Sequence, residues 1–337
     1  MKIVDMHCDT IAEIWYSQKD VAAGKAEVCK NLRENDLQLD LMKMKQGDYL
    51  LQNFAMFVNM KRKENPFESV MHLVDVFYTE MEKNKDLIGV VKNYADIEKN
   101  MQEGKMSAML TAEEGEVCKG ELSFLRDLYR LGVRMMTLTW NHENSLAYPN
   151  NVPGDGEKVF PYEPDMSRGL KEKGFAFIEE MERLGIIIDV SHLSDAGFYD
   201  VYEHTRKPFV ASHSNARALC GHCRNLTDDM IRRLAERGGV TGLNYCCSFL
   251  MDPDENGHVQ SRVARMAEHA QYLAKVGGID CIGLGSDFDG IGGDLEMKDA
   301  SMLPLLVDAL QKSGFHESEV DKILYKNVLR VYKEVLL

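Results

Sequence analysis

The sequence predicts an α/β fold, specifically a closed (β/α)8 barrel. Short apolar runs alternate along the chain with longer amphipathic runs, and this alternation is typical of a parallel sheet with helices packed outside it. Eight such apolar runs can be counted, which is the number that closes this kind of barrel. The length of 337 residues is one that α/β barrels reach as a single unit, so we expect residues 1–337 to form one domain.

The predicted strands and helices follow one another from the N-terminus onward. The strand candidates are residues 2–7, 50–58, 107–112, 133–139, 186–192, 209–213, 239–245 and 281–287. Runs with apolar residues at helical spacing cover residues 67–82, 95–102, 122–131, 167–184, 227–237, 259–276, 304–312 and 317–336. The proline-rich segment 148–165 predicts a long surface loop, and loops of that length near a site often cover it.

Composition and charge exclude several classes of function. The net charge of −14 argues against a surface for nucleic acid or an anionic membrane, because either partner needs a basic patch. No apolar run has the length of a signal peptide or a transmembrane helix, and the charged C-terminal residues do not match a lipid-anchor signal. We therefore expect a cytoplasmic protein whose cysteines are mostly reduced thiols.

Imidazole and carboxylate side chains follow five of the eight predicted strands. They are His7 with Asp9, Glu113 with Glu114, His192, His213 and Asp287. Taken singly, each has an ordinary interpretation as a rim histidine, a turn or N-cap aspartate, or a solvated glutamate pair. Taken together they favour a metal site, because strand ends meet at one mouth of a barrel and several buried charges need a compensating cation.

The residue types narrow the choice of metal. Imidazole and carboxylate ligands without a set of thiolates suit zinc or a similar divalent ion, and the same ligands would also hold manganese or cobalt. The set could hold two ions: two imidazoles on one side, an imidazole and an aspartate on the other, and a glutamate between these two groups. Two such ions would share a hydroxide and polarise a substrate oxygen.

In their order along the chain, these motifs resemble the membrane (renal) dipeptidase family of zinc peptidases. The matching motifs are Asp5-Met6-His7-Cys8-Asp9, Glu113 before a glycine turn, Asp189-Val190-Ser191-His192, Ser212-His213-Ser214-Asn215-Ala216-Arg217, Arg224-Asn225 and Gly285-Ser286-Asp287-Phe288-Asp289-Gly290. The resemblance covers nearly the whole chain and implies a metal-dependent hydrolase barrel. Mammalian relatives carry a signal peptide and a lipid anchor, which are missing here, so we expect a soluble member of bacterial type.

The resemblance also implies a role for each matched metal ligand. His7 and Asp9 would bind one zinc ion. His192 and His213 would bind the second. Glu113 would bridge both ions, and Glu114, where relatives commonly have glycine, would be its neighbour.

Substrate contacts follow from the same resemblance. Asp287 matches the residue that acts as acid and base and meets the substrate's amino group, and Arg224 matches the arginine that receives the C-terminal carboxylate. The implied reaction is attack of a metal-bridging hydroxide on the peptide bond of a free dipeptide, with broad specificity that extends to D-residues at the C-terminal position. Relatives support the carbonyl with a histidine after the fourth strand; here Trp140 occupies that place, and His142 is the candidate substitute.

Other interpretations stay open at this stage. The chain could be another amidohydrolase of the same barrel superfamily, acting on cyclic amides or β-lactams, although many of those begin with His-x-His and bridge their metals with a carboxylated lysine. A non-catalytic metal-binding relative is a further alternative, and the resemblance implies a homodimer. The segment Cys220-Gly221-His222-Cys223 is similar to a redox motif, but it lies outside a thioredoxin-like unit, so we expect inert thiols.

Overall fold

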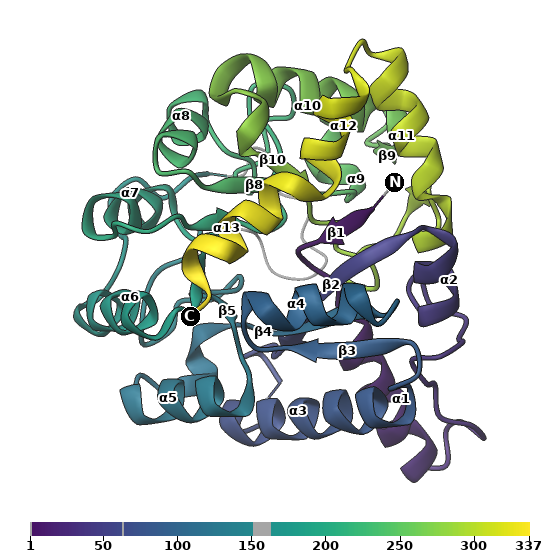
Figure 1. The fold of residues 1–337 in the computed structure, drawn as a ribbon. Coiled ribbons are helices and arrows are strands. Elements are labelled where there is room, and N and C mark those ends of the chain that lie inside the picture. Colours follow the sequence, from purple (N-terminus) through teal and green to yellow (C-terminus); the bar gives the residue numbers. More distant parts are fainter. Residues whose placement is uncertain (1, 63, 151–162) are drawn as a thin grey trace.

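Parallel strands close into an eight-stranded barrel in the computed structural model, which describes residues 2–62, 64–150 and 163–337 (Figure 1). In ring order the strands are β1 (Ile3–Asp5), β2 (Tyr49–Phe57), β4 (Met106–Glu113), β5 (Met135–Thr137), β6 (Ile187–Asp189), β7 (Val210–Ala211), β8 (Val240–Leu243) and β10 (Ile282–Leu284). The ring closes where Asp5 of β1 pairs with Leu284 of β10. The predicted (β/α)8 barrel is thus confirmed, with strands shorter than most of the predicted runs.

Three strands were not predicted from the sequence. β3 (Ile88–Val91) pairs with the first half of β4, from Met106 to Met109, while β5 pairs with the second half of β4. β3 therefore extends the sheet beside the ring without being part of it. β9 (Gln260–Ser261) and β11 (Asp294–Leu295) form a separate two-stranded pair. Runs this short carry too little periodicity to be recognised.

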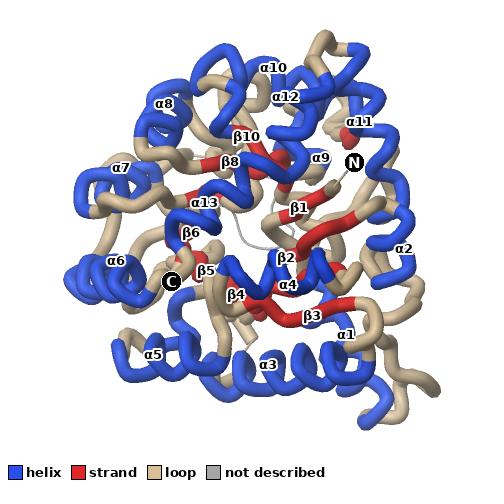
Figure 2. The backbone as a smooth tube through the Cα atoms, viewed as in Figure 1, coloured by secondary structure: helices blue, strands red, loops and turns tan. Residues whose placement is uncertain are grey.

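Helices cover the outside of the barrel (Figure 2). They are α1 (Thr10–Ala22), α2 (Leu41–Gln46), α3 (Pro66–Lys83), α4 (Tyr94–Gln102), α5 (Leu122–Leu131), α6 (Glu172–Leu184), α7 (Asp195–His204), α8 (Asp228–Glu236), α9 (Cys247–Leu250), α10 (Val263–Gly277) and α11 (Leu303–Lys312). The predicted helix 167–184 begins later, at Glu172, because the Asp165 side chain accepts hydrogen bonds from the backbone of Ser167 and Arg168 and forms a turn. Of the predicted loop 148–165, residues 151–162 lie outside the described residues.

The starts of α3 and α4 show how local sequence fixes helix boundaries. Asn65 accepts a hydrogen bond from the backbone of Phe67, and Pro66 takes the first helical position, where its missing N–H costs nothing. Asn93 and Asp96 form a reciprocal capping box at the start of α4. Both helices were predicted to within one residue at each end.

The C-terminal segment closes the amino end of the barrel. It consists of α12 (Glu317–Asp321), a π-helical turn (Lys322–Lys326) and α13 (Asn327–Val335), which follow one another without a break where a helix over residues 317–336 was predicted. Val328 and Val331 of α13 belong to the same apolar cluster as Val4 inside the barrel, and the Tyr332 hydroxyl donates to Asn53 Oδ1 at 2.9 Å. The segment runs across the ring in Figure 1. The opposite, carboxyl end of the barrel is where the predicted site residues lie.

An ion cluster joins α5 to α6. Glu180 of α6, with a side chain 9% exposed, accepts hydrogen bonds from Arg126 of α5 and from Arg183. The bonds to Arg183, and then those to Arg126, lower the pKa of Glu180 to about 2.

No described helix is long and apolar enough to cross a membrane.

Replacing Glu180 by glutamine should lower the free energy of unfolding by about 1 kcal/mol at pH 7, because both arginines are half-exposed and water screens the pair. Because the pKa of Glu180 is lowered, its ion pairs stabilise the fold at pH values above the ordinary pKa of 4.5. This stabilisation is lost as the pH falls from 4.5 toward 2. Urea unfolding of both proteins at pH 7, 5 and 3 measures the difference. A difference of the same size at pH 3 as at pH 7 would contradict the assignment.

Candidate active site

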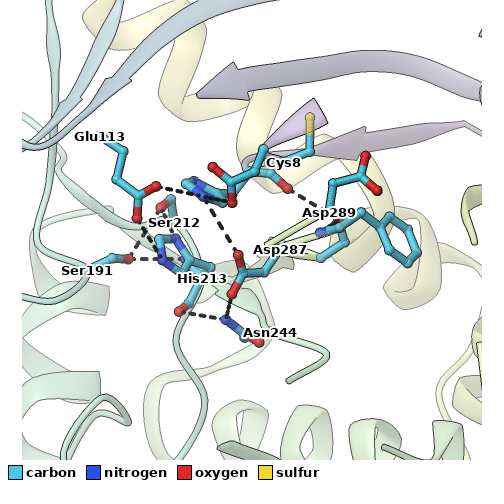
Figure 3. A network of polar contacts seen from close by, with 12 residues as sticks. Cys8, Glu113, Ser191, Ser212, His213, Asn244, Asp287 and Asp289 are labelled. Carbon is cyan, nitrogen blue, oxygen red and sulfur yellow. Dashed lines mark hydrogen bonds and ion pairs between the residues drawn. The ribbon is translucent and has the colours of Figure 1, made fainter. Parts of the chain in front are cut away.

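The carboxyl ends of the barrel strands meet at a cavity of about 310 Å³. Its lining residues come from strand ends and from the loops that follow them: Asp9, Ala12, Glu13, Tyr16, Phe57, Arg62, Glu113, Trp140, Asn141, His192, Cys246, Phe249, Asp287, Asp289, Gly290 and Ile291. His7 and His213, both 1% exposed, lie directly beneath. Figure 3 shows the Glu113, His213 and Asp287 side chains gathered around the same space.

All five predicted metal ligands are brought together around Glu113. Its Oε1 atom lies 3.1 Å from His192 Nε2 and 3.8 Å from His213 Nε2. Its Oε2 atom lies 3.4 Å from His7 Nε2, which is in turn 3.6 Å from Asp9 Oδ2. The two carboxylate oxygens therefore face two different sets of ligands, as a bridging carboxylate requires.

Several features of this cluster fit a bound divalent cation. His7 Nε2 and Asp9 Oδ1 are buried with no hydrogen-bond partner in the described ranges, and the Nε2 atoms of His192 and His213 face one another at 2.9 Å. A Cβ at Gly290 would lie 2.2 Å from Asp9 Oδ2 and 2.6 Å from Asp287 Oδ1, so only glycine at this position leaves room for the Asp9 and Asp287 carboxylates. The donors are nitrogen and oxygen, the set that suits zinc and similar ions.

The charge states of two of the three imidazoles point the same way, whereas the charge of Glu113 outweighs burial and raises the pKa of His7 well above its ordinary value, so His7 would release a proton when a cation binds. Burial lowers the pKa of His192 to about 4 and holds that of His213 well below its ordinary value, so both rings are neutral, which is the ligating form. Burial opposes ionisation of Glu113, but the charge of His7 holds its pKa below the ordinary value. Burial, with the charge of Glu113, raises the pKa of Asp9 to about 6. A cation would keep both carboxylates ionised.

A hydrogen-bonded network orients two of the imidazoles. His213 Nδ1 lies 2.7 Å from Ser212 Oγ, and Ser212 Oγ donates to Asp189 Oδ2 at 2.5 Å. His192 Nδ1 lies 2.7 Å from Asn141 Oδ1. Such partners fix the ring tautomer and leave Nε2 for the metal. The position of Asn141 was not predicted, because nothing in the sequence links Asn141 to His192.

Asp287 stands at the edge of the metal cluster. Its Oδ1 lies 3.8 Å from His7 Nε2, and its Oδ2 accepts a hydrogen bond from Asn244 at 2.9 Å. Burial, with the charges of Asp9 and Glu113 adding to it, raises the pKa of Asp287 to about 7. A carboxyl group in this condition can both accept and donate a proton near neutral pH. Asn244 is a further site residue that the sequence did not indicate.

Arg224 is a buried guanidinium, only 4% exposed. Its terminal nitrogens donate long hydrogen bonds to Ser214 Oγ and to the backbone oxygen of His213, and its Nε has no partner within the described part of the chain. Among residues 2–62, 64–150 and 163–337 no carboxylate forms an ion pair with it. Because a buried charge is costly when unpaired, this guanidinium is suited to an anionic ligand. It stacks beside Phe249, which lines the cavity.

The structure separates the roles expected of Trp140 and His142. Trp140 lines the cavity and packs against Phe57, with ring centroids 5.0 Å apart. His142 packs edge-on against Trp140, with ring centroids 5.4 Å apart, and is not among the residues that line the cavity. His142 thus contacts a residue of the cavity wall, and the substrate role expected of it stays a prediction.

Glu114 does not form a solvated pair with Glu113. It is fully buried and accepts hydrogen bonds from the backbone of Trp140 at 3.0 Å and of Glu116 at 2.8 Å, and one from the Asn144 side chain. Its φ of 106° is in the region that glycine favours. Glu114 therefore ties the loop after β5 to the strand that carries Glu113.

Cys220 and Cys223 are both buried. Burial raises the pKa of Cys220 to about 12 and that of Cys223 to about 11. Because the thiolate is the reactive form, these values favour the expected inert thiols over a redox pair.

Comparisons with known proteins agree with this geometry. A model of the membrane dipeptidase family (peptidase family M19) matches residues 1–336. The chain is 38% identical over 242 residues to an uncharacterised protein in the pqqA 5′ region of Klebsiella pneumoniae, covering 72% of this chain and 86% of that protein. It is 31% identical over 351 residues to an uncharacterised dipeptidase of Schizosaccharomyces pombe, covering 100% of this chain and 81% of that protein. A crystal structure of a metallopeptidase from Rhodobacter sphaeroides, liganded with a phosphinate mimic of the dipeptide L-Ala-D-Ala, aligns with a TM-score of 0.88 at 25% identity and covers 99% of each chain.

Proposed function

Because the chain belongs to the membrane dipeptidase family and is a metallodipeptidase, we propose that it hydrolyses free dipeptides with two zinc ions held by His7, Asp9, Glu113, His192 and His213. The observation that carries this proposal is the position of Glu113, whose two oxygens face different imidazoles. Manganese or cobalt would fit the same donors. We further propose that residues 1–337 act as one catalytic domain.

When bound, such ions polarise a carbonyl oxygen and lower the pKa of water to about 7. The chain's own residues then have three tasks: they hold the ions, fix both ends of the substrate and move one proton. Glu113, His192 and His213 are almost fully buried, so the electrostatic interactions among them are only weakly screened by water.

Asp287 is proposed to move the proton. Asn244 holds its Oδ2, which leaves Oδ1 directed toward His7 and the cavity. Oδ1 would accept a proton from the attacking water and donate it to the leaving amine as the C–N bond breaks. The same carboxylate would meet the ammonium group of the substrate.

Arg224 is proposed to receive the C-terminal carboxylate. Its planar group presents several N–H donors, matching the two oxygens of a carboxylate. The Rhodobacter sphaeroides relative holds a mimic of a dipeptide with a C-terminal D-residue, so we propose that this chain also accepts D-residues at that position.

Replacing Arg224 by methionine should reduce kcat/KM for a free dipeptide by about 100-fold, because the substrate carboxylate loses a buried charged partner. The variant should turn over C-amidated dipeptides at about the same low rate as the wild type, since these lack the carboxylate. Initial rates on free, C-amidated and N-acetylated dipeptides and on tripeptides measure both effects. The exposed Arg206, changed to methionine, is the control. Equal turnover of free and blocked dipeptides by the wild type would contradict the roles of Arg224 and Asp287.

A further inference from the structure

Asn141 is a cavity residue whose side chain has one hydrogen-bond partner, His192, among the residues that the structure describes. The atom that faces His192 Nδ1 at 2.7 Å is Oδ1. His192 Nε2 faces Glu113 and His213 at 3.1 and 2.9 Å. An imidazole that gives Nε2 to a cation keeps its proton on Nδ1, so the ring donates and the carbonyl of Asn141 accepts.

This assignment leaves the amide nitrogen of Asn141 available. Among the described residues Asn141 Nδ2 has no hydrogen-bond partner, although the residue lines the cavity. An amide nitrogen carries two N–H donors. Fixed donors of this kind at a water-poor site stabilise negative charge that develops on a carbonyl oxygen.

The backbone that carries Asn141 is held from both sides. The N–H of Trp140 donates to Glu114 Oε2 at 3.0 Å, and the Asn144 side chain donates to the backbone oxygen of Leu138 at 2.9 Å. The Trp140 ring also packs against Phe57. Asn141 is therefore placed by β4 and β5 together, and a donor held in this way needs little reorganisation during a reaction.

We propose that Asn141 has two functions in peptide hydrolysis, and this proposal rests on the dipeptidase function given above. Its side-chain carbonyl keeps His192 in the tautomer that ligates through Nε2. Its amide N–H donates a hydrogen bond to the oxygen of the scissile carbonyl while water adds to the carbonyl carbon and before the C–N bond breaks. No bond to Asn141 forms or breaks, and the proton passes to the leaving amine through Asp287. Asn141 thus takes the carbonyl-supporting role for which His142 was the candidate.

Two substitutions separate these functions. Asn141→Asp keeps an oxygen acceptor for His192 but removes the amide donor, so zinc affinity should be no weaker than in the wild type while kcat falls by about 10²-fold or more. Asn141→Ala removes both groups, so zinc affinity should also fall by about 10- to 100-fold. The exposed Asn256, changed to alanine, is the matched control and should leave both quantities unchanged.

The measurements are the zinc dissociation constant by competition with a chromophoric chelator, kcat and KM at saturating zinc, and the ¹⁵N chemical shifts of His192 with zinc bound. A kcat within 3-fold of the wild type in Asn141→Asp would overturn the donor role. Wild-type zinc affinity in Asn141→Ala, with unchanged His192 shifts, would overturn the positioning role. If the wild type does not cleave dipeptides at all, the dipeptidase function fails, while the zinc and ¹⁵N measurements still decide the positioning role.

Discussion

Replacing Glu113 by glutamine is expected to lower kcat/KM by about 10³-fold or more and to reduce the metal content below that of the wild type. The two oxygens of Glu113 face His7 on one side and His192 on the other. A glutamine offers one neutral oxygen and an N–H₂ group that repels cations. Substitutions of residues that only hydrogen-bond to metal ligands already lower metal affinity about 10- to 100-fold. The loss of the Glu113 carboxylate itself should therefore lower metal affinity further.

Metal analysis of the dialysed proteins, together with rates on a free dipeptide, measures the effect of Glu113→Gln. Glu116→Gln is the control, because Glu116 lies in the next turn and its side chain accepts a backbone N–H from Ser145 at 2.7 Å, which glutamine can also accept. A Glu113→Gln protein with as much metal as the wild type would show that Glu113 does not bridge the ions.

Replacing Asp287 by asparagine is expected to lower kcat by about 10²- to 10⁴-fold, with metal content unchanged. Asparagine nearly preserves the shape and can still bond to Asn244, but it cannot carry a proton to the leaving amine. Without a cation, burial raises the pKa of Asp287 to about 7. Cations held beside His7 and Asp9 would lower this pKa, so Asp287 would first act as a proton acceptor.

The same variant tests a competing role for Asp287. Ligand atoms of His7, Asp9 and Asp287 lie within 4.8 Å of one another, so Asp287 could instead bind a metal ion. In that case Asp287→Asn would lose metal together with activity, which would contradict its assignment as the acid and base. The exposed Asp294, changed to asparagine, controls for the charge change.

The sequence predicted that the proposed metal ligands meet because they stand at or shortly after the ends of four strands, with His7 and Asp9 following the same one. A parallel barrel brings all its carboxyl ends to one face, so four local patterns were enough to place His7, Asp9, Glu113, His192 and His213 together. No knowledge of loop paths was needed. The same argument placed Asp287 at the end of β10.

Residues on the loops could not be placed in this way. Asn141 contacts His192 because Glu114 holds the loop after β5 in place. Glu114 itself has a φ of 106°, which residues other than glycine rarely adopt. Helix α1 was missed for a related reason. Asp9 precedes its first residue but makes no capping hydrogen bond, because its carboxylate is directed into the site.

Strained backbone marks the same region. His192, Asp287 and Asp289 have φ values of 70°, 63° and 70°, and strain of this kind gathers at functional sites. Such conformations depend on the surrounding fold, so the sequence does not reveal them.

The most direct test of the account is a crystal structure of the metal-loaded protein, with anomalous diffraction recorded on both sides of the zinc absorption edge. The account predicts two zinc peaks, one on each side of the Glu113 carboxylate. One peak should contact His7 and Asp9, and the other His192 and His213. A single peak, or peaks located away from Glu113, would contradict it.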